Sequence, residues 1–309
     1  YFIYFFYLIK INIRDYFLKL KHTLMIRKIF NIFTFVSTRK FIFFIRNLIN
    51  KEIIKFLYRK IIFYLKKIFY LKKNKIKQNE NEINKYFKDI KKNGFLILEN
   101  FIDKNNCKKI INEIDSFKES NENLVWQDVT NSEFRLFGAE KINKEIMNFF
   151  SNKTFINLGS KCLGRKILNL MTMANRIEAK KNNLGSGGGW HRDDINFQFK
   201  AIIYLSDVDE NNGPFQLLEK SNNFLNIIRD SIKSKFNILN TRIENRNIAL
   251  LDQKRVKTIT GKAGTLILVD TSLIHRGKPL NKGFRYALTN YYYPYYQVDS
   301  MKNHFLPKI

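Results

Sequence analysis

The chain has 309 residues, 45% of them hydrophobic and 15% aromatic, so it is long and apolar enough to bury a large core and is not disordered throughout. It has two cysteines, Cys107 and Cys162, which argue against a disulfide scaffold and indicate a reducing compartment, the cytoplasm. The formal net charge of +28 suggests nucleic acid or an anionic membrane as a partner, although the abundance of Lys, Asn, Ile and Phe indicates that part of it reflects base composition.

The positive charge is concentrated in the first 77 residues, which contain 19 Lys or Arg against only Asp15 and Glu52. Gly and Pro are absent from this region. Between Phe41 and Leu71, polar residues recur at spacings of three and four among Ile, Phe, Leu and Tyr, which predicts an amphipathic helix with a basic face. We therefore predict a basic amphipathic helical arm over residues 1–77 and a globular domain over residues 78–309.

The arm is too often interrupted by lysine to span a bilayer, since its longest apolar run ends at Ile9 and a span needs about 18 residues. A basic helix with a broad aromatic face is typical of helices that lie on an anionic membrane surface. The alternative is an arm that packs on the globular domain or on a partner protein. Sequence alone leaves both interpretations open.

After residue 85 the pattern changes. Residues 94–101, GFLILENF, alternate as a half-buried strand does. Asp103 is then a helix N-cap, and the residues that follow form one apolar helical face, namely Cys107, Ile110, Ile111 and Ile114.

From Leu170 onward, short runs typical of strands follow one another with turn residues between them: LMTMANRIEA, FKAIIYLSDV, GPFQLLE, NIALLD, GTLILVD and RYALTNYYY. Such a series without alternating long helices predicts a mainly β domain, a sandwich or jelly roll. Residues 223–239 have helical spacing and are expected to form an insertion between strands.

The segment GSGGGWHRDD, residues 185–194, contains one of the four histidines. His191 and Asp193 are two positions apart, so in extended backbone both side chains point to the same face and can bind one ion. Asp194 points to the opposite face and is the weaker alternative. The glycines lack the ending of a phosphate loop and predict a mobile approach to a pocket.

His275 follows the apolar run GTLILVD and can return to the same face from across a sheet. Two imidazoles and one carboxylate form a facial triad, which binds iron(II) on one side and leaves about three coordination positions open. Open positions indicate catalysis, because a structural zinc site is closed by four ligands. The predicted metal ligands are therefore His191, Asp193 and His275.

Arg285 follows His275 after the turn-rich segment GKPLNKGF, so a hairpin would bring it back beside the metal. An arginine there can pair in bidentate fashion with the far carboxylate of 2-oxoglutarate. Asn175, on the strand that enters the glycine-rich segment, is a second candidate for contact with the oxoacid. The expected cofactors are Fe(2+) and 2-oxoglutarate as a co-substrate, with O2 in the last coordination position.

From about Gly94 to Tyr295 the chain resembles the phytanoyl-CoA dioxygenase-like family of iron(II)- and 2-oxoglutarate-dependent oxygenases. The resemblance rests on GFLILENFID with its following helix, WHRD, AIIYLSDVDENNGPFQ, GTLILVDTSLIHRG and Arg285. It implies a double-stranded β-helix with flanking α-helices, in which His191, Asp193 and His275 bind iron and Arg285 holds 2-oxoglutarate. Halogenating members lack the carboxylate ligand, so the presence of Asp193 favours hydroxylation.

The predicted function is a non-haem oxygenase that hydroxylates a small-molecule or a lipid- or saccharide-linked substrate and releases succinate and CO2. We expect it in the cytoplasm, peripherally on the cytoplasmic membrane face. The alternative is a non-catalytic jelly-roll binding module whose basic arm binds a membrane or a partner. Nucleic acid is disfavoured, because the charge lies in the arm and is not interleaved with aromatic residues along the strands of the candidate site.

Overall fold

The structure is a computed structural model that describes residues 51–73, 81–121 and 125–305. The chain divides into two compact units, Tyr1–Ile54 and Lys55–Ile309, and the larger unit contains the elements described below, except for the first residues of α4. The part of the predicted arm before residue 51 lies outside the described residues. The predicted domain boundary after residue 77 stays a prediction.

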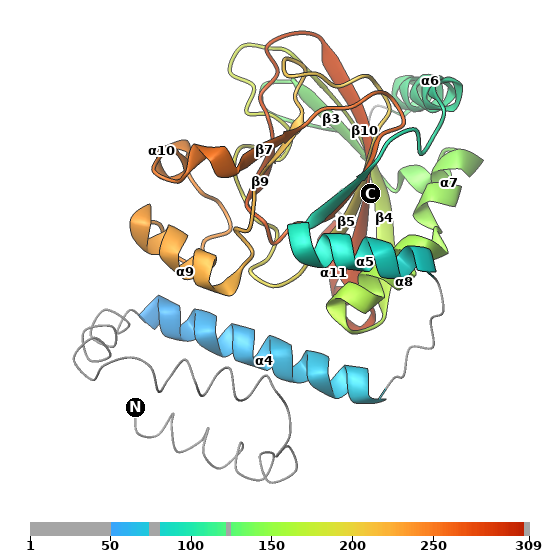
Figure 1. The fold of residues 1–309 in the computed structure, drawn as a ribbon. Coiled ribbons are helices and arrows are strands. Elements are labelled where there is room, and N and C mark those ends of the chain that lie inside the picture. The colour runs from blue at the N-terminus through green and yellow to red at the C-terminus, as the bar shows by residue number, and fades with distance from the viewer. Residues whose placement is uncertain (1–50, 74–80, 122–124, 306–309) are drawn as a thin grey trace, which may run out of the picture. The chain divides into compact units, whose positions relative to one another are not determined.

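Two antiparallel sheets form the centre of the larger unit (Figure 1). The strand order is β1-β8-β5-β10-β4-β3-β2 in the larger sheet and β7-β6-β9 in the smaller one. The bounds are β1 Phe95–Leu98, β2 Val125–Gln127, β3 Glu133–Phe137, β4 Ile167–Glu178, β5 Phe199–Tyr204, β6 Phe215–Leu218, β7 Val256–Ile259, β8 Leu266–Asp270, β9 His275–Gly277 and β10 Phe284–Pro294. This arrangement confirms the predicted jelly roll with flanking helices.

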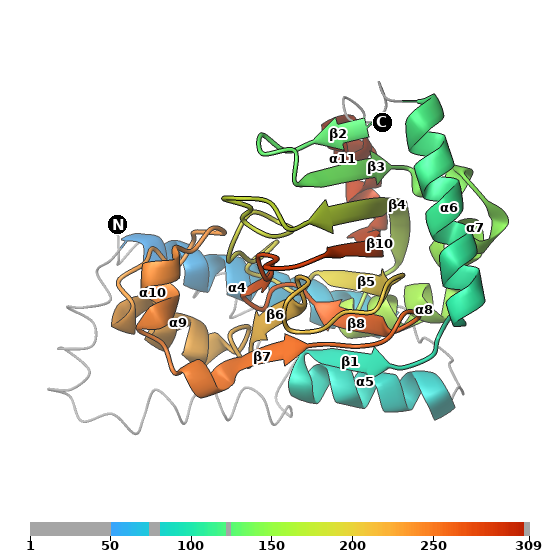
Figure 2. The ribbon, with the colours of Figure 1, turned by 90° about the horizontal axis from the view of Figure 1, so that it is seen from above.

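Helices surround the two sheets. Their bounds are α4 Lys51–Lys73, α5 Asn81–Asn93, α6 Lys104–Ser120, α7 Lys144–Phe150, α8 Lys153–Leu163, α9 Phe224–Lys233, α10 Asn245–Ala249 and α11 Val298–Phe305, with short 3-10 turns at Ala139–Lys141, Gln253–Arg255 and Tyr295–Gln297. Figures 1 and 2 show α6, α7 and α8 on one side of the larger sheet, whereas α9 and α10 lie beside the smaller sheet. The predicted insertion is present as α9, which ends at Lys233, short of the predicted end at residue 239, and Asp103 caps α6 through the amides of Asn105 and Asn106. The run NIALLD, predicted as a strand, is instead the end of α10 and the turn after it.

Alternation along the strands separates a helix-covered face of the larger sheet from an interior face. On β5, Ile203 packs in the cluster shared with the helices, whereas Ile202 packs between the sheets. On β10, Leu288 packs in the cluster shared with the helices, whereas Ala287 packs between the sheets. Because side chains two positions apart share a face, the register of the sheet assigns every other strand residue to the interior.

Helix α4 places two of its lysines against the domain. Lys60 Nζ donates to Ile195 O and Lys67 Nζ donates to Cys162 O, each at 2.6 Å. Desolvation lowers the pKa of Lys60 to about 8. The amphipathic helix is thus present over Lys51–Lys73, but its basic residues do not all lie on the solvent side.

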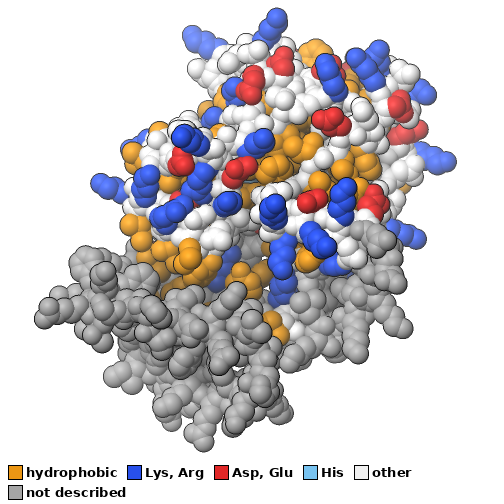
Figure 3. Space-filling view, viewed as in Figure 1, with side chains coloured by type: hydrophobic (Ala, Val, Ile, Leu, Met, Phe, Trp, Pro, Cys, Tyr) orange, Lys and Arg blue, Asp and Glu red, His pale blue; other side chains and the backbone are white. Residues whose placement is uncertain are grey.

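Basic side chains on the visible face of the domain are mixed with acidic and hydrophobic ones, as Figure 3 shows. On this face the described lysines and arginines are therefore not gathered into a single stripe. Among the helices that the structure describes, none has the length and hydropathy needed to cross a membrane.

Arg255 anchors the α9 insertion. Its guanidinium donates to both carboxylate oxygens of Asp230 at 2.9 Å, and the Asp230 side chain is only 2% exposed. Arg255→Ala would leave that buried carboxylate with only Arg229, whose Nε lies 3.7 Å from Oδ1 on a 62% exposed side chain. We therefore expect it to lower the free energy of unfolding by about 3 kcal/mol in urea titrations. The matched change Arg246→Ala breaks a pair with Glu244 that is 80% and 64% exposed, and should cost no more than about 1 kcal/mol. Equal losses in the two variants would contradict the anchor.

Candidate functional site

Two segments far apart in sequence bring three candidate ligands together. His191 N donates to His275 O at 2.9 Å and His275 N donates to His191 O at 2.7 Å, which makes an antiparallel bridge. Asp193 N donates to Thr271 O at 3.0 Å and continues the pairing. One ligand atom from each of His191, Asp193 and His275 lies within 4.8 Å of the other two, so the group could hold one metal ion.

Backbone carbonyls orient both imidazoles. Nδ1 of His191 lies 2.8 Å from Gly189 O, and Nδ1 of His275 lies 2.8 Å from Leu273 O. A carbonyl oxygen only accepts, so the proton of each ring belongs on Nδ1 and the lone pair on Nε2. Each Nε2 lies 3.9 Å from a different carboxylate oxygen of Asp193, on the side where a cation would bind.

The protonation states of the triad suit a cation. Desolvation and the neighbouring His275 lower the pKa of His191 to about 3, and desolvation lowers the pKa of His275. Burial raises the pKa of Asp193, but Lys200 and the two imidazoles together lower it by a larger amount. The net pKa is therefore below the usual range. Two neutral nitrogens and one carboxylate form the donor set that fits iron(II).

The register of the larger sheet identifies further side chains on the interior face. Arg135 of β3 pairs with Asn175 of β4, and Asn175 pairs with Ala287 of β10, which belongs to the interior core. Arg285 precedes Ala287 by two residues and so shares its face. Of the residues predicted from sequence, Asn175 and Arg285 therefore line the same interior.

Arg285 is a buried cation near the triad. It is 4% exposed, donates to Gly213 O and has no hydrogen-bond partner for Nε. Gly213 comes two residues before Phe215, whose ring centroid lies 5.3 Å from that of His275. No carboxylate of the described residues lies within ion-pair distance of this guanidinium, and desolvation lowers its pKa. A bound carboxylate would supply the missing acceptor, so the site fits an oxoacid.

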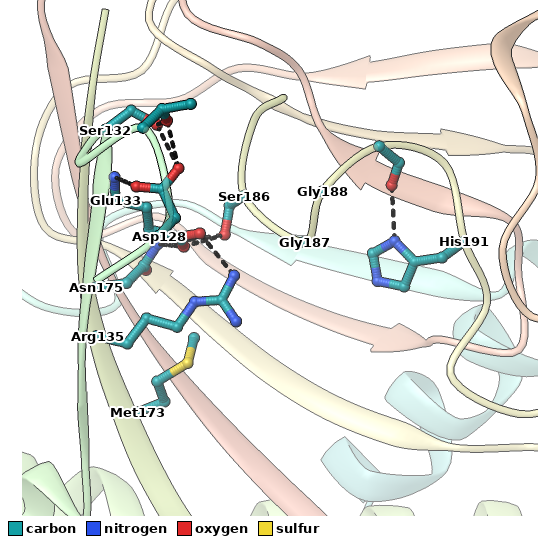
Figure 4. Close-up of polar contacts among 12 residues, drawn as sticks. Asp128, Ser132, Glu133, Arg135, Met173, Asn175, Ser186, Gly187, Gly188 and His191 are labelled. Carbon is teal, nitrogen blue, oxygen red and sulfur yellow. Dashed lines mark hydrogen bonds and ion pairs between the residues drawn. The ribbon is translucent and has the colours of Figure 1, made fainter. Parts of the chain in front are cut away.

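A polar network around Glu133 lines the interior beside Arg135 (Figure 4). Glu133 accepts hydrogen bonds from Asn175 Nδ2 at 2.9 Å, Ser186 Oγ at 2.7 Å and Arg135 Nη2 at 2.6 Å. Figure 4 shows Met173 next to Arg135, with His191 across from them. The predicted contact of Asn175 with the oxoacid stays a prediction, because its amide group is engaged in this network.

The glycine-rich segment is held by several contacts. Besides the bond from Ser186 to Glu133, Gly277 N donates to Ser186 O at 3.0 Å and Arg242 Nη1 donates to Gly187 O. Gly187 has φ +88°, and a Cβ there would lie 2.5 Å from His191 Cε1. The mobile approach predicted from the glycine content stays a prediction.

Sequence reasoning missed three charged residues of the interior, Lys200, Arg135 and Glu133. Lys200 Nζ lies 2.8 Å from Asp193 Oδ2. A lysine inside the apolar run FKAIIY was the one available signal, because such a position implies a buried partner. Asp194 caps a turn by accepting from Asn196 N at 2.9 Å, and it is not one of the three clustered ligands.

A jelly roll with two histidines and a carboxylate converging on one point, beside a buried arginine, defines the class of non-haem iron oxygenases. The sequence pattern of the family described as Phytanoyl-CoA dioxygenase (PhyH) matches residues 90–287, more than half of the chain. The chain belongs to this family of iron(II)- and 2-oxoglutarate-dependent oxygenases. A search of curated proteins gave no match.

Solved structures share the fold. A non-heme α-ketoglutarate-dependent carbocyclase, SnoK from nogalamycin biosynthesis, has a TM-score of 0.50 and 12% identity over 70% of this chain and 85% of its own. The epimerase SnoN in complex with Fe3+, α-ketoglutarate and nogalamycin RO has a TM-score of 0.50 and 12% identity over 69% and 84%. HygX from Streptomyces hygroscopicus, with nickel and 2-oxoglutarate bound, has a TM-score of 0.47 and 14% identity over 69% and 87%. At these identities the likeness to SnoK and SnoN shows the fold alone.

Two glycines of the same segment test whether Gly187 makes room for His191. Gly187→Ala should displace the imidazole and weaken Fe(II) binding by about tenfold or more in anaerobic titrations, as loss of a residue that orients a metal ligand does. Gly188 has φ +67° and only an ordinary contact at 3.6 Å for an added Cβ, so Gly188→Ala carries backbone strain without the contact to His191. We expect Gly188→Ala to bind Fe(II) nearly as the wild type does. Equal weakening in both variants would assign the effect to strain instead.

Proposed function

We propose that this protein is an Fe(II)- and 2-oxoglutarate-dependent hydroxylase acting on a small-molecule or a lipid- or saccharide-linked substrate, with release of succinate and CO2. The observation that carries the proposal is the convergence of three metal-ligand atoms within 4.8 Å, on His191, Asp193 and His275, in a chain of this family. The buried guanidinium of Arg285 supports the co-substrate.

In this proposal the two imidazoles and the Asp193 carboxylate hold the metal from one side, and Arg285 binds the far carboxylate of 2-oxoglutarate. Bound iron, with the oxoacid and O2, supplies the oxidising chemistry. The protein's part is to orient and to exclude water: carbonyls fix both rings through Nδ1, and Arg285 fixes the oxoacid by a charged, directional contact. Arg135 and Asn175 line the same interior and are further candidates for contact with the oxoacid.

The type of oxidation is the finer part of the proposal. Hydroxylation is favoured by Asp193, which completes the triad. The structural neighbours include an epimerase, solved with Fe3+ and α-ketoglutarate, and an α-ketoglutarate-dependent carbocyclase. Mass spectrometry of the product separates these outcomes, because hydroxylation adds one oxygen atom whereas epimerisation and ring closure do not.

Arg285→Gln is expected to raise the Kd for 2-oxoglutarate by about 10-fold to 100-fold, since hydrogen bonds to charged groups contribute about 1.5–3 kcal/mol. The measurement is an anaerobic titration of the Fe(II)-loaded protein that follows the weak visible band of the chelate. Arg276→Gln is the control, because Arg276 is directed to Gln216 and the Trp190 ring. The proposed anchor is wrong if both variants bind 2-oxoglutarate as the wild type does.

Incubation of the Fe(II)-loaded protein with 2-oxoglutarate in the presence of O2 distinguishes the oxygenase from a non-catalytic binding module. An oxygenase should convert 2-oxoglutarate to succinate slowly even without its substrate, and the conversion should stop in His191→Ala. A protein that binds 2-oxoglutarate but releases no succinate with any candidate substrate would favour the binding module.

We also propose that α4 lies on an anionic membrane at the cytoplasmic face. Its exposed side carries large apolar residues next to basic ones, a combination that suits the lipid interface: Tyr58, Ile61, Tyr64 and Leu65 beside Arg59 and Lys66. A partner protein is the alternative occupant of this side.

Replacing Tyr58, Tyr64 and Leu65 together by Ser should reduce binding to phosphatidylserine vesicles by about tenfold or more, because each buried apolar side chain contributes about 1.5–3 kcal/mol. Vesicle co-sedimentation measures the effect, and raised salt should weaken the wild type as well. The control replaces Tyr295 and Tyr296, two tyrosines that are each 64% exposed near the other end of the chain. If the wild type does not sediment with anionic vesicles, the membrane proposal is wrong.

A further inference from the structure

Lys200 is a charged residue in an otherwise apolar strand. All six residues of β5, FKAIIY, are buried. Lys200 pairs with Tyr291 of β10 and with Val269 of β8, and it precedes Ile202 of the interior core by two positions. Its side chain therefore points into the interior of the jelly roll, toward the candidate metal centre.

Two contacts hold the ammonium group there. Nζ lies 2.8 Å from Oδ2 of Asp193 and 4.3 Å from the centre of the Tyr291 ring. The Asp193 carboxylate and the face of the Tyr291 ring are the kinds of partner that a buried ammonium group needs. A buried lysine without such partners would be strongly disfavoured.

The position of this ammonium limits how Asp193 can bind a metal. Each carboxylate oxygen faces one imidazole, since Oδ1 lies 3.9 Å from His191 Nε2 and Oδ2 lies 3.9 Å from His275 Nε2. Of the two, only Oδ2 is also contacted by Lys200, at 2.8 Å. Two imidazoles and a carboxylate bound through one oxygen leave about three of six positions open, whereas a carboxylate bound through both leaves about two. A chelating oxoacid takes two positions, so one remains for O2 only in the first case.

We propose that Lys200 is a positioning residue for Asp193. Its ammonium holds Oδ2, so the metal is bound through Oδ1 alone and the coordination position needed beside the oxoacid stays open. It also offsets the negative charge of the carboxylate, which would otherwise repel the dianionic co-substrate. This inference rests on the proposed function.

The test is an anaerobic titration of the Fe(II)-loaded protein with 2-oxoglutarate, comparing three proteins. In Lys200→Met the carboxylate is free to bind through both oxygens, so we expect Fe(II) binding to persist, 2-oxoglutarate to bind about tenfold or more weakly, and the chelate band to weaken or shift. Lys200→Arg keeps the cation and the donor, and should restore the band with a Kd within about threefold of the wild type.

Lys262→Met is the matched control, because it removes a lysine that lies 3.1 Å from Asp207 in an exposed pair. It should leave the band and the Kd unchanged. If Lys200→Met does not fold, as judged by circular dichroism, Lys200→Ile takes its place with the same expectation, since it also removes the charge and the donor and suits an apolar strand.

Three outcomes would overturn the inference. Wild-type affinity and an unchanged band in Lys200→Met would show that the ammonium does not control the ligand, and so would equal weakening in Lys200→Arg and Lys200→Met. A wild-type protein that forms no chelate band would overturn the proposed function and the inference together. A normal wild-type band with an unaltered variant overturns the inference alone.

Discussion

The reciprocal backbone hydrogen bonds between His191 and His275 are the constraint on which the candidate site depends. They join the segment after the glycines to β9, although the two residues are far apart in the sequence. Slippage of either segment by one residue would turn an imidazole to the opposite face. The α9–α10 insertion supports the same segment from its other side, where Arg192 N donates to Thr241 O and Ile243 N donates to Trp190 O. The insertion is thus part of the scaffold that fixes the ligand register.

The features predictable from sequence are those governed by local backbone geometry. The two-residue spacing of His191 and Asp193 places both on one face of any extended segment, whatever the rest of the fold. Strand alternation and the cap at Asp103 are local in the same sense and are present as predicted. The placement of His275 and Arg285 depends on which distant strands pair with each other, and the resemblance to a known family supplied that pairing.

The features that could not be predicted depend on partners from distant segments. Pattern analysis treats lysine as a solvent-facing residue, yet Lys60 binds Ile195 O and Lys200 binds Asp193. Glu133 likewise accepts hydrogen bonds from Asn175 and Ser186, and no spacing in the sequence predicts these contacts. A buried charge is stable only with its partner, and the partner becomes identifiable once the sheet register is known.

Charge pairing also separates Arg285 from Arg135 and Lys200. Arg135 forms an ion pair with Glu133, and Lys200 forms one with Asp193. Within the described part of the chain, the Arg285 guanidinium donates a hydrogen bond only to the Gly213 carbonyl, and its Nε has no hydrogen-bond partner. Leaving such a group unpaired in a buried site is costly, so a bound carboxylate would stabilise the folded protein as well as complete the site. Of these three cations, Arg285 alone has no carboxylate partner, and a dianionic oxoacid would supply one.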